Sequence, residues 1–540
     1  MMTIKTQKYP SRNQLPGRRR QRPSLLQIAQ GTTVVFIIWI VGMQWMIISK
    51  FQVQQRGWRK FVADPYSMPA TNKWYRLTAI AKNLTCHDLF GWDQIVTSHE
   101  ISNATCFEHA HLGWIACYLG KMQINASKVQ GSMGGEDMLL VRNRPEKEEQ
   151  LNFEPGAVRL SQTVPARLIQ TVAPVMKLLL QSAIVDPLLR QNSTQSLHHN
   201  QPKSWSKASN ITLFVKRGAY ANPCMSMISM YNVWLVLRMF RIHPDHRPRP
   251  QIVWLDGHAS TSLDEIWYHL FQSPPIHLQR ILASSATSET ENNPNNTLHQ
   301  FQHAIVVNTK SAMADEGLWR HRWNKNTSAS QGCFNSDDHT SASSNTLIQF
   351  RDFVLERYGV QRPKQRRNSS HLLLTLLVRQ DYKAHPRSDG RTDRTLANVT
   401  RDALYLQSLY PNHTIQIVSF ERLSFRQQIL IMVQTDLFVA VHGAGNVHAL
   451  FLPPGATFVE YIPKGFESRQ RFKYLAECVL ANITYIAERA TVVHRDHESQ
   501  KITVQLQPLA KSTQIPPVAK RKTIQPRKNV IRHTGRNLRE

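Results

Sequence analysis

The feature that most constrains the fold is a regular alternation of apolar and amphipathic segments between residues 371 and 487. Continuous apolar runs such as HLLLTLLVR and DLFVAV are typical of strands buried on both faces of a parallel sheet. Segments with helical spacing lie between them, and Pro453 and Gly455 close one of these segments. Strands and helices in this order predict a doubly wound α/β domain whose ligand lies at the carboxyl ends of the strands.

A second strand–helix–strand pattern precedes this region. ITLFVKRG and QIVWLDG predict strands, and MYNVWLVLRMFRI between them predicts a helix. Low-complexity stretches at 284–297 and 324–345 predict insertions, and the charged, proline-bearing segment 361–370 predicts an interdomain boundary. A chain of 540 residues is also too long for one compact core, so we expect two globular domains.

The N-terminal region predicts a membrane anchor. No charged residue lies between Pro23 and Lys50, and Gly31 to Ser49 is almost wholly apolar, which is long enough for a helix to cross a bilayer. A cleaved signal peptide is the alternative, but the apolar core is long and no small-x-small cleavage pattern follows it. Seven basic residues precede the segment, so the short N-terminus is expected in the cytosol and the rest of the chain in a lumen.

Cysteines and glycosylation sequons fit that topology. All six cysteines follow the apolar segment, where disulfides can persist, and the sequence leaves their pairing open. No cysteine or histidine spacing suggests zinc, so we expect no bound metal. Eleven N-x-S/T sequons also follow the segment, at Asn83, Asn103, Asn125, Asn192, Asn210, Asn295, Asn326, Asn368, Asn398, Asn412 and Asn482.

The formal net charge of +29 does not by itself indicate a nucleic-acid partner. Much of it lies in the two ends of the chain, where residues 1–22 carry seven Lys or Arg and residues 508–540 carry nine. Such charged runs are usually solvated segments, and no nucleic-acid-binding motif accompanies them. We therefore expect no nucleic-acid partner.

The stretch VAVHGAGNVHALFLPPGATFVEY, Val439 to Tyr461, is the strongest candidate for a binding site. It carries the chain from a strand through His442 and a glycine-rich turn, Gly443 to Gly445, into a helix. Glycines allow positive φ and close approach of a ligand, and a helix N-terminus favours an anion. His442 and His448 are candidate hydrogen-bond donors to phosphate oxygens. Glu460, expected at the end of the next strand, is a candidate ribose contact.

HGAGNVHALFLPPGATFVEYIP resembles the signature of glycosyltransferase family 61, which includes the EGF-domain O-linked N-acetylglucosamine transferase and plant xylosyltransferases. LLVR, ending at Arg379, and RTLAN, beginning at Arg394, resemble two further elements of that family. The resemblance extends over about 371–487 and is weaker over about 210–360.

The resemblance implies a GT-B architecture, two Rossmann-like domains facing a cleft, and an inverting transfer from a UDP-sugar without a cofactor or metal. It assigns Arg379 and Arg394 to the donor diphosphate, and His442, Gly443, Ala444, Gly445 and His448 to the same group. It assigns Glu460 to the ribose.

The general base is where this chain departs from the family. Members typically carry A-N-x-x-H-x-x-x-D-x-Y-N, but this chain reads ANPCMSMISMYN, with Met225 and Ser229 in place of the histidine and the aspartate. Neither side chain removes a proton at neutral pH. Asp256 is the first candidate to replace them; the nearby alternatives are His258, Asp264 and Glu265.

Six segments are predicted. They are a cytosolic basic tail (1–24), a transmembrane anchor (25–49), a stem (50–80), an N-terminal Rossmann-like acceptor-side domain with disordered insertions (81–360), a C-terminal Rossmann-like UDP-sugar-binding domain (361–490) and a basic, largely disordered tail (491–540).

Two functions remain open. One is a Golgi type II membrane enzyme, with the endoplasmic reticulum as the alternative compartment, that transfers xylose or N-acetylglucosamine to a glycan or glycoprotein. The other is a catalytically weak or inactive lumenal homologue that binds sugar nucleotide or glycan.

Overall fold

The computed structural model divides the chain into two compact units, Met1–Ser67 and Met68–Glu540, and every residue described here lies in the second. The predicted anchor and stem therefore lie outside the described residues. Within the residues that are described, no helix is long and apolar enough to cross a bilayer. The described ranges, some with small internal gaps, are 95–99, 105–109, 115–191, 210–287, 298–307, 346–362, 371–379, 394–464, 483–495 and 502–506.

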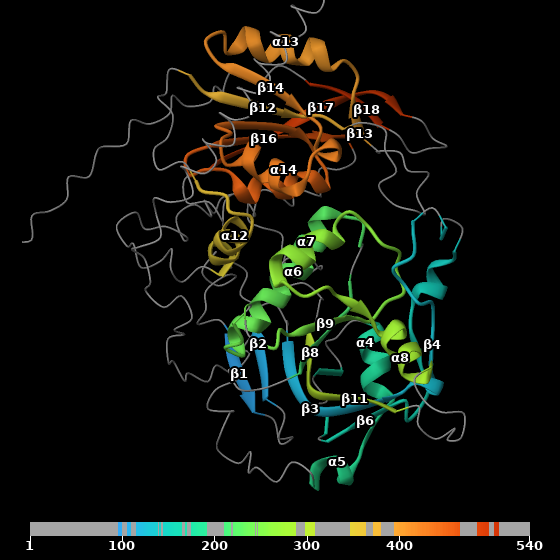
Figure 1. Cartoon of the computed structure of the whole chain (residues 1–540). Helices are drawn as coiled ribbons and strands as arrows, with labels where there is room; N and C mark the ends of the chain where they lie inside the picture. The colour runs from blue at the N-terminus through green and yellow to red at the C-terminus, as the bar shows by residue number, and fades with distance from the viewer. Residues whose placement is uncertain are drawn as a thin grey trace, which may run out of the picture. The chain divides into compact units, whose positions relative to one another are not determined.

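The first large sheet has nine strands, in the order β1-β2-β3-β11-β8-β9-β10, with β6 paired to β3 and β7 paired to β6 (Figure 1). A separate small sheet pairs β4 with β5. The strands are β1 (Ile95–His99), β2 (Thr105–His109), β3 (Ile115–Asn125), β4 (Val129–Gln130), β5 (Asn152–Phe153), β6 (Val158–Leu160), β7 (Ala183–Val185), β8 (Ile211–Val215), β9 (Gln251–Trp254), β10 (Ile276–His277) and β11 (Leu298–Val307).

Four strands of this sheet, β10, β9, β8 and β11, are parallel. They occur along the chain as third, second, first and fourth, which is the order of half of a doubly wound sheet. The direction of winding therefore reverses between β8 and β11. The βαβ unit predicted from 211 to 257 is confirmed, and its helix begins earlier than predicted, at Pro223.

Helices cover both faces of the first sheet. Alternate residues of β8 point to opposite sides, with Leu213 packing in one apolar cluster and Phe214 in another. The first cluster includes residues of α6 (Pro223–Met239), α7 (Asp264–Phe271) and α12 (Thr346–Arg357); the second includes residues of α4 (Pro174–Gln181) and α8 (Leu278–Thr287). One further short helix is α5 (Pro187–Gln191).

A disulfide joins Cys106 on β2 to Cys117 on β3, which lie directly opposite each other in the antiparallel pair. This settles one pairing that the sequence left open. Three other cysteines, Cys86, Cys333 and Cys478, lie outside the described residues.

The second large sheet has seven strands in the order β13-β18-β17-β16-β15-β12-β14. Its five parallel strands, from β14 to β17, follow the chain order second, first, third, fourth, fifth, so the winding reverses between β12 and β15. The strands are β12 (Leu373–Leu377), β13 (Arg394–Leu396), β14 (Thr414–Val418), β15 (Leu437–Val441), β16 (Thr457–Pro463), β17 (Thr484–Arg495) and β18 (Ile502–Leu506).

Both faces of this sheet are also covered. On β15, Val439 packs in a cluster with Leu406 of α13 (Val399–Leu409), whereas Phe438 packs with Ile429 of α14 (Phe425–Met432). The helix η6 (Ala444–Phe451) lies in the second of these clusters, together with the short turn η5 (Phe420–Arg422). Figure 1 shows α13 and α14 on opposite sides of the strands. The predicted doubly wound arrangement is therefore present here.

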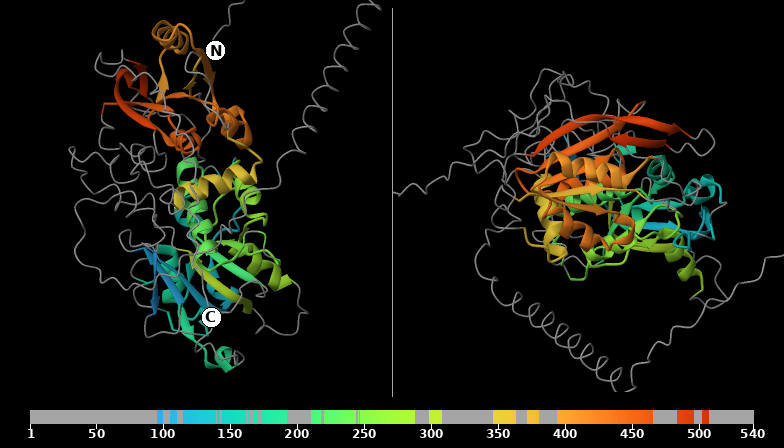
Figure 2. Two further views of the ribbon diagram at one scale, coloured as in Figure 1. Left: turned by 90° about the vertical axis from the view of Figure 1, so that its left-hand side faces the viewer. Right: turned by 90° about the horizontal axis from the view of Figure 1, so that it is seen from above.

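Several details differ from the expectations. The strand β13 occupies residues predicted to be a loop and the start of a helix, and β18 lies in the segment predicted to be a disordered tail. Both are possible because β17 continues to Arg495 and pairs with β18 as the long ribbon at the red end of the colour scale in Figure 2. An edge strand that depends on a distant partner leaves little local signal.

The two sheets belong to one unit, and helix α6 of the first part contacts η6 of the second. Tyr358, just after α12, also accepts a hydrogen bond at its carbonyl oxygen from Nε of Arg426 on α14, at 3.1 Å. The boundary predicted at 361–370 falls between α12 and β12, and of its residues only 361 and 362 are described. It remains a prediction.

Candidate functional site

The crevice between β12 and β15 is the candidate binding site. In doubly wound sheets a ligand lies where the winding reverses, beyond the carboxyl ends of the strands. The chain leaves β12 at Leu377 and reaches Arg379, and it leaves β15 at Val441 and reaches His442 and Gly443. Two segments that the sequence singled out separately are thus neighbours at the reversal.

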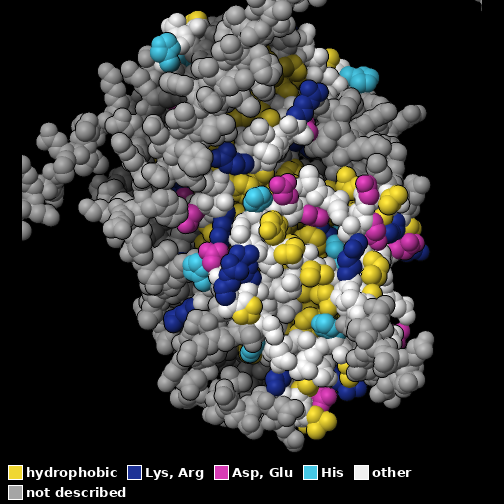
Figure 3. All heavy atoms as spheres, viewed as in Figure 1, with side chains coloured by type: hydrophobic (Ala, Val, Ile, Leu, Met, Phe, Trp, Pro, Cys, Tyr) yellow, Lys and Arg dark blue, Asp and Glu magenta, His cyan; other side chains and the backbone are white. Residues whose placement is uncertain are grey.

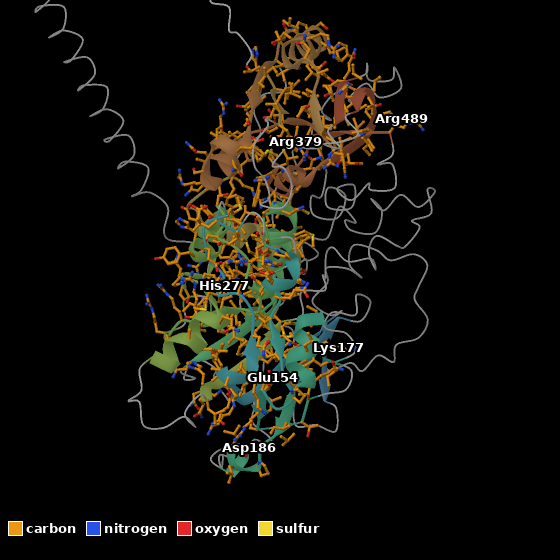
Figure 4. The ribbon with its side chains drawn as sticks, turned by 90° about the vertical axis from the view of Figure 1, so that its right-hand side faces the viewer. Glu154, Lys177, Asp186, His277, Arg379 and Arg489 are labelled. Atoms are coloured by element: carbon orange, nitrogen blue, oxygen red, sulfur yellow. A yellow bond between two sulfur atoms is a disulfide. The ribbon has the colours of Figure 1, made fainter. Side chains whose placement is uncertain are left out.

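Arg379 packs directly against Gly443. A Cβ atom added at Gly443 would lie 1.2 Å from Nη2 of Arg379, so only glycine leaves room for the guanidinium. The φ angle of Gly443 is 168°, which is extended backbone that any residue adopts. Of the two reasons for glycine in this turn, positive φ does not apply at Gly443, where glycine instead allows the close approach of Arg379. Figure 4 labels Arg379 within the second sheet.

The turn leads into the N-terminus of η6. Gly443 precedes the helix, and no side chain caps it within the described residues. Ala444 and Gly445 are only half-buried, although the rest of η6 is buried. The N–H groups of an uncapped first turn attract an anion, and a guanidinium beside them adds positive charge. This corner can hold a diphosphate.

Glu460 differs from its predicted place. It lies in the middle of β16, not at its end, because the strand continues to Pro463. Its carboxylate is fully buried and accepts hydrogen bonds from Nδ1 of His442 at 2.7 Å, Nδ2 of Asn446 at 3.0 Å and the hydroxyl of Tyr485. A carboxylate held by three protein donors is a positioning group for His442 and Asn446, and this geometry argues against the ribose contact predicted for it.

His448 also has a structural place. Its Nδ1 lies 2.8 Å from the carbonyl oxygen of Gly445 and its Nε2 lies 2.7 Å from Oε1 of Gln428. The ring is buried against Phe420 and Phe425, and burial lowers its pKa to about 4, so it is neutral at pH 7. Because both nitrogens face protein atoms, the structure argues against the phosphate contact predicted for His448.

Arg394 lies at the same edge of the sheet as the diphosphate corner. It begins β13, which is parallel to β18, and β18 is antiparallel to β17. The start of β13 therefore lies at the edge where β15, β16 and β17 end. In the sheet order β18, β17 and β16 stand between β13 and β15, but β13 also contacts β15 directly.

Asn446 was not found by sequence reasoning. Its side chain is buried, its Nδ2 donates to Glu460, and its Oδ1 has no hydrogen-bond partner within the described part of the chain. An unsatisfied buried acceptor costs about 1–3 kcal/mol. One residue after Gly445, this oxygen is a candidate acceptor for a ligand donor, and no motif distinguished it from an ordinary helix residue.

Asp256 proves to be an unsuitable base. Its carboxylate accepts from Nη2 of Arg217 at 2.7 Å, and both side chains are buried. It also accepts from the backbone N–H of Arg217 and of His258, each at 3.2 Å. Although burial alone would raise its pKa, the Arg217 charge and hydrogen bonds hold the pKa far below its ordinary value. A permanently ionised, paired carboxylate is a weak proton acceptor.

The other base candidates differ from one another. Asp264 bonds Nη1 of Arg217 at 3.2 Å, and Glu265 is an exposed residue of α7 beside His269. Ser229 donates to the carbonyl oxygen of Met225 at 3.1 Å inside α6. Among these candidates, His258 alone has a buried carboxylate partner, Glu149, which sequence reasoning did not single out.

Residues 267–459 match the family model described as Glycosyltransferase 61. This part of the chain is therefore similar to glycosyltransferase 61 proteins. Its matched range includes Arg379, Arg394 and the whole turn from His442 to Gly445.

The relatives are glycosyltransferases. The chain is 24% identical to the rice Beta-1,2-xylosyltransferase RCN11 over 64% of its length, which covers 63% of that enzyme and thus less than two thirds of it. It is 23% identical to the Arabidopsis thaliana Beta-1,2-xylosyltransferase over 69% of its length and 73% of that enzyme. It is 32% identical to the Drosophila melanogaster EGF domain-specific O-linked N-acetylglucosamine transferase, over 25% of this chain and 22% of that enzyme.

The glycosyltransferase 61 match does not cover the whole molecule. Glu149, Arg217, Asp256 and His258 precede it, so their arrangement is read from the structure alone. No group of three or more His, Cys, Asp or Glu side chains in the described ranges could hold a metal ion. On the face drawn in Figure 3, basic, acidic and histidine side chains are interspersed over the described surface.

Proposed function

We propose that this glycosyltransferase 61 protein transfers a sugar from a UDP-sugar to a glycan or glycoprotein acceptor with inversion at the anomeric carbon. The observation that carries the proposal is the packing of Arg379 on Gly443 beside the uncapped N-terminus of η6. The corner supplies positive charge and backbone donors to a diphosphate, which is the group that links nucleoside and sugar in a UDP-sugar.

The same corner suits the chemistry of the leaving group. As the bond between the sugar and the β-phosphate breaks, negative charge develops on the phosphate oxygen. Arg379 and the N–H groups of Ala444 and Gly445 would stabilise that charge without a metal, as preorganised donors do. His442, oriented by Glu460, would add a third contact, and Arg394 would contribute longer-range positive charge.

The sugar is proposed as xylose or N-acetylglucosamine. Support comes from the relatives, which are named as xylosyltransferases and N-acetylglucosamine transferases. Asn446 Oδ1 would accept a hydrogen bond from the donor, and the remaining contacts to the sugar would come from the part of the chain that carries the first sheet.

The architecture is proposed to be GT-B, with both sheets contributing to one active site. Support comes from the two parallel sheets and from the contact between α6 and η6. We also propose a type II membrane protein of the Golgi, with the endoplasmic reticulum as the alternative. The apolar segment 31–49, the sequons and the Cys106–Cys117 disulfide support a lumenal catalytic region.

The alternative is a lumenal homologue that binds sugar nucleotide or glycan without efficient transfer. Met225 and Ser229 favour it, because Ser229 is buried and donates its hydroxyl hydrogen to a helix carbonyl. The donor corner would be the same in both functions.

Turnover with UDP-sugars separates the two. The purified full-length chain is incubated with UDP-xylose or UDP-N-acetylglucosamine and a mixture of N-linked glycopeptides, O-mannosyl peptides and EGF repeats, and UDP release is measured. We expect one donor to raise the melting temperature and to turn over. Donor binding without turnover on any acceptor would favour the inactive homologue. Failure to bind UDP at about 1 mM would contradict both functions.

A further inference from the structure

The carboxyl edge of the first sheet holds His258, one of the alternative base candidates, among several fixed contacts. His258 follows β9 by four residues, and β9 pairs with β8, the strand that borders the reversal of winding. This is the edge at which doubly wound sheets place their ligands. The feature is therefore in a position where a substrate can be handled.

Glu149 fixes the imidazole. Its Oε2 lies 2.7 Å from Nδ1 of His258, and the glutamate side chain is only 1% exposed. A neutral histidine donates at one nitrogen and accepts at the other, so the carboxylate selects the tautomer with the proton on Nδ1. Nε2 is then the basic nitrogen. It makes no hydrogen bond within the described part of the chain, and the side chain keeps 9% of its surface exposed.

Tyr220 fixes the plane of the ring. The two rings stack with centroids 4.2 Å apart and an interplanar angle of 9°. Tyr220 stands just before Asn222, the N-cap of α6, and its carbonyl oxygen accepts from Oγ of Ser226 in the first turn. The imidazole therefore lies at the start of α6, the helix that contacts η6 of the donor corner.

The backbone around His258 is also held in place. The N–H of Gly257 donates to the carbonyl oxygen of Glu149, and the N–H of Gly135 donates to that of His258, both at 2.8 Å. A Cβ at Gly257 would lie 2.0 Å from Oγ of Ser132. Two loops thus close over the end of β9 and leave His258 little freedom to change its rotamer.

The other buried titratable groups near His258 have partners of their own. Asp256 is paired with Arg217, and Asp264 bonds the same guanidinium. His277 on β10 contacts the carbonyl oxygen of Asp256 through Nδ1 at 2.7 Å, and burial lowers its pKa to about 4, so it stays neutral. Glu149 is thus the carboxylate that faces His258 directly.

We propose that His258 is the general base of the transfer and that Glu149 and Tyr220 position it. Nε2 of His258 takes the proton of the acceptor hydroxyl as that oxygen forms a bond to the anomeric carbon. The bond from the anomeric carbon to the β-phosphate oxygen breaks, and its electron pair leaves with UDP. Glu149 stabilises the imidazolium that forms, as a carboxylate does in a catalytic triad. This inference rests on the proposed function.

The test compares four full-length variants with the wild type, using UDP-xylose and UDP-N-acetylglucosamine with the glycopeptide mixture. His258→Ala should lose about 10²- to 10⁴-fold in kcat, which is the usual contribution of a general base. Its melting temperature rise on adding UDP should be unchanged, because the donor corner is intact. Added imidazole should restore part of the activity of this variant, which a purely structural role does not predict.

Glu149→Gln keeps a hydrogen-bond acceptor for Nδ1 and removes the charge. We expect a smaller loss of kcat, with the acid limb of its pH profile moved to lower pH because the imidazolium loses its counter-charge. The groups around the ring that titrate or carry charge are Glu149, Arg217, Asp256, Asp264 and His277. Glu149→Asp serves as the conservative variant. The acid limb of its pH profile should match that of the wild type if the shorter carboxylate still reaches Nδ1.

His269→Gln is the matched control. His269 pairs with Glu265 at 3.5 Å, but on the exposed surface of α7, where its side chain is 42% exposed. We expect its kcat and pH profile to equal those of the wild type. Turnover by His258→Ala within threefold of the wild type would overturn the base assignment and leave the proposed function standing. A wild type that binds no UDP and releases none would overturn the proposed function and this inference together.

Discussion

Nη2 of Arg379 occupies the place where the Cβ of any residue other than glycine at position 443 would stand, 1.2 Å away. The guanidinium and the turn are therefore one structural unit, although they come from different strands. Arg379 can lie against the start of η6 only because position 443 has no side chain.

Gly443→Ala should therefore impair donor binding. The methyl group has to displace Arg379, so we expect the affinity for UDP to fall about 10- to 100-fold, the loss of roughly one charge-assisted contact. Thermal shift titration with UDP measures the change. In Arg379→Lys the affinity for UDP should fall similarly, because lysine lacks the planar guanidinium. The control is Arg489→Lys, at an exposed arginine of the same sheet that is labelled in Figure 4, and it should bind UDP as the wild type does.

Glu460→Gln should destabilise the protein. A glutamine at this buried position loses charge-assisted hydrogen bonds from His442 and Tyr485, so the free energy of unfolding should fall by about 1.5–3 kcal/mol. Urea unfolding measures it. UDP binding should weaken as well, because His442 and Asn446 lose their anchor. Tyr485→Phe should show a smaller loss, and an unchanged midpoint in Glu460→Gln would contradict the positioning role.

Asp256→Asn should act mainly on stability. It leaves Arg217 buried with half of its counter-charge gone, and breaking such a pair typically costs about 3–5 kcal/mol. Any folded fraction should keep its kcat, since Asp256 is not the base. A stable Asp256→Asn protein with a kcat reduced about 100-fold would restore Asp256 as the catalytic residue.

The stability of the protein should decrease between pH 6.5 and pH 4. Burial lowers the pKa of His277 to about 4, so in this window the unfolded chain binds a proton that the folded chain excludes. Unfolding is then favoured as the pH falls, by up to about 3 kcal/mol for this group. His277→Gln should show a flatter dependence in urea unfolding at pH 7, 6 and 5. His371→Gln, at an exposed histidine, should keep the wild-type slope.

Removing the disulfide should lower stability in the first sheet. Cys106 and Cys117 are eleven positions apart, and closing a loop of this size contributes about 3 kcal/mol in the chain-entropy account. The double variant Cys106→Ser, Cys117→Ser should melt several degrees lower, as should the wild type in dithiothreitol. If the reductant lowers the melting temperature of the double variant by as much as that of the wild type, the effect does not come from this bridge.

Much of the second sheet could be predicted from the sequence. The apolar runs over β12, β15 and β16 are local signals, because a strand buried on both faces is apolar at nearly every position. The N-cap of α13 is also a local feature, because asparagine is a favoured N-cap residue and the Asn398 side chain accepts from the N–H of Arg401. By contrast, β13 has one apolar residue in three, and it is a strand because it pairs with β18, which is distant in the chain.

The candidate site was only partly predictable. The turn at 442–445 was singled out because glycines before a helix suit a diphosphate, and Arg379 because LLVR resembles an element of glycosyltransferase family 61. The structure places the two together. His448 and Glu460 were assigned to the ligand because histidine and glutamate can bind one, but burial gives their polar atoms protein partners instead. Glu149 was missed, since a single acid in an acidic loop gives no signal of the histidine it faces.

The sequence by itself determined the order of strands and helices, the glycine-rich turn and the positive residues available to a diphosphate. These follow from periodicity and residue type, which act over a few neighbouring positions. Only the tertiary structure decided which side chains meet. The reversal of winding between β12 and β15 brings Arg379 to Gly443, and the closing of two loops over β9 brings Glu149 to His258. Burial then determines the role of each polar group, because a polar atom inside the protein must take whichever partner the packing provides.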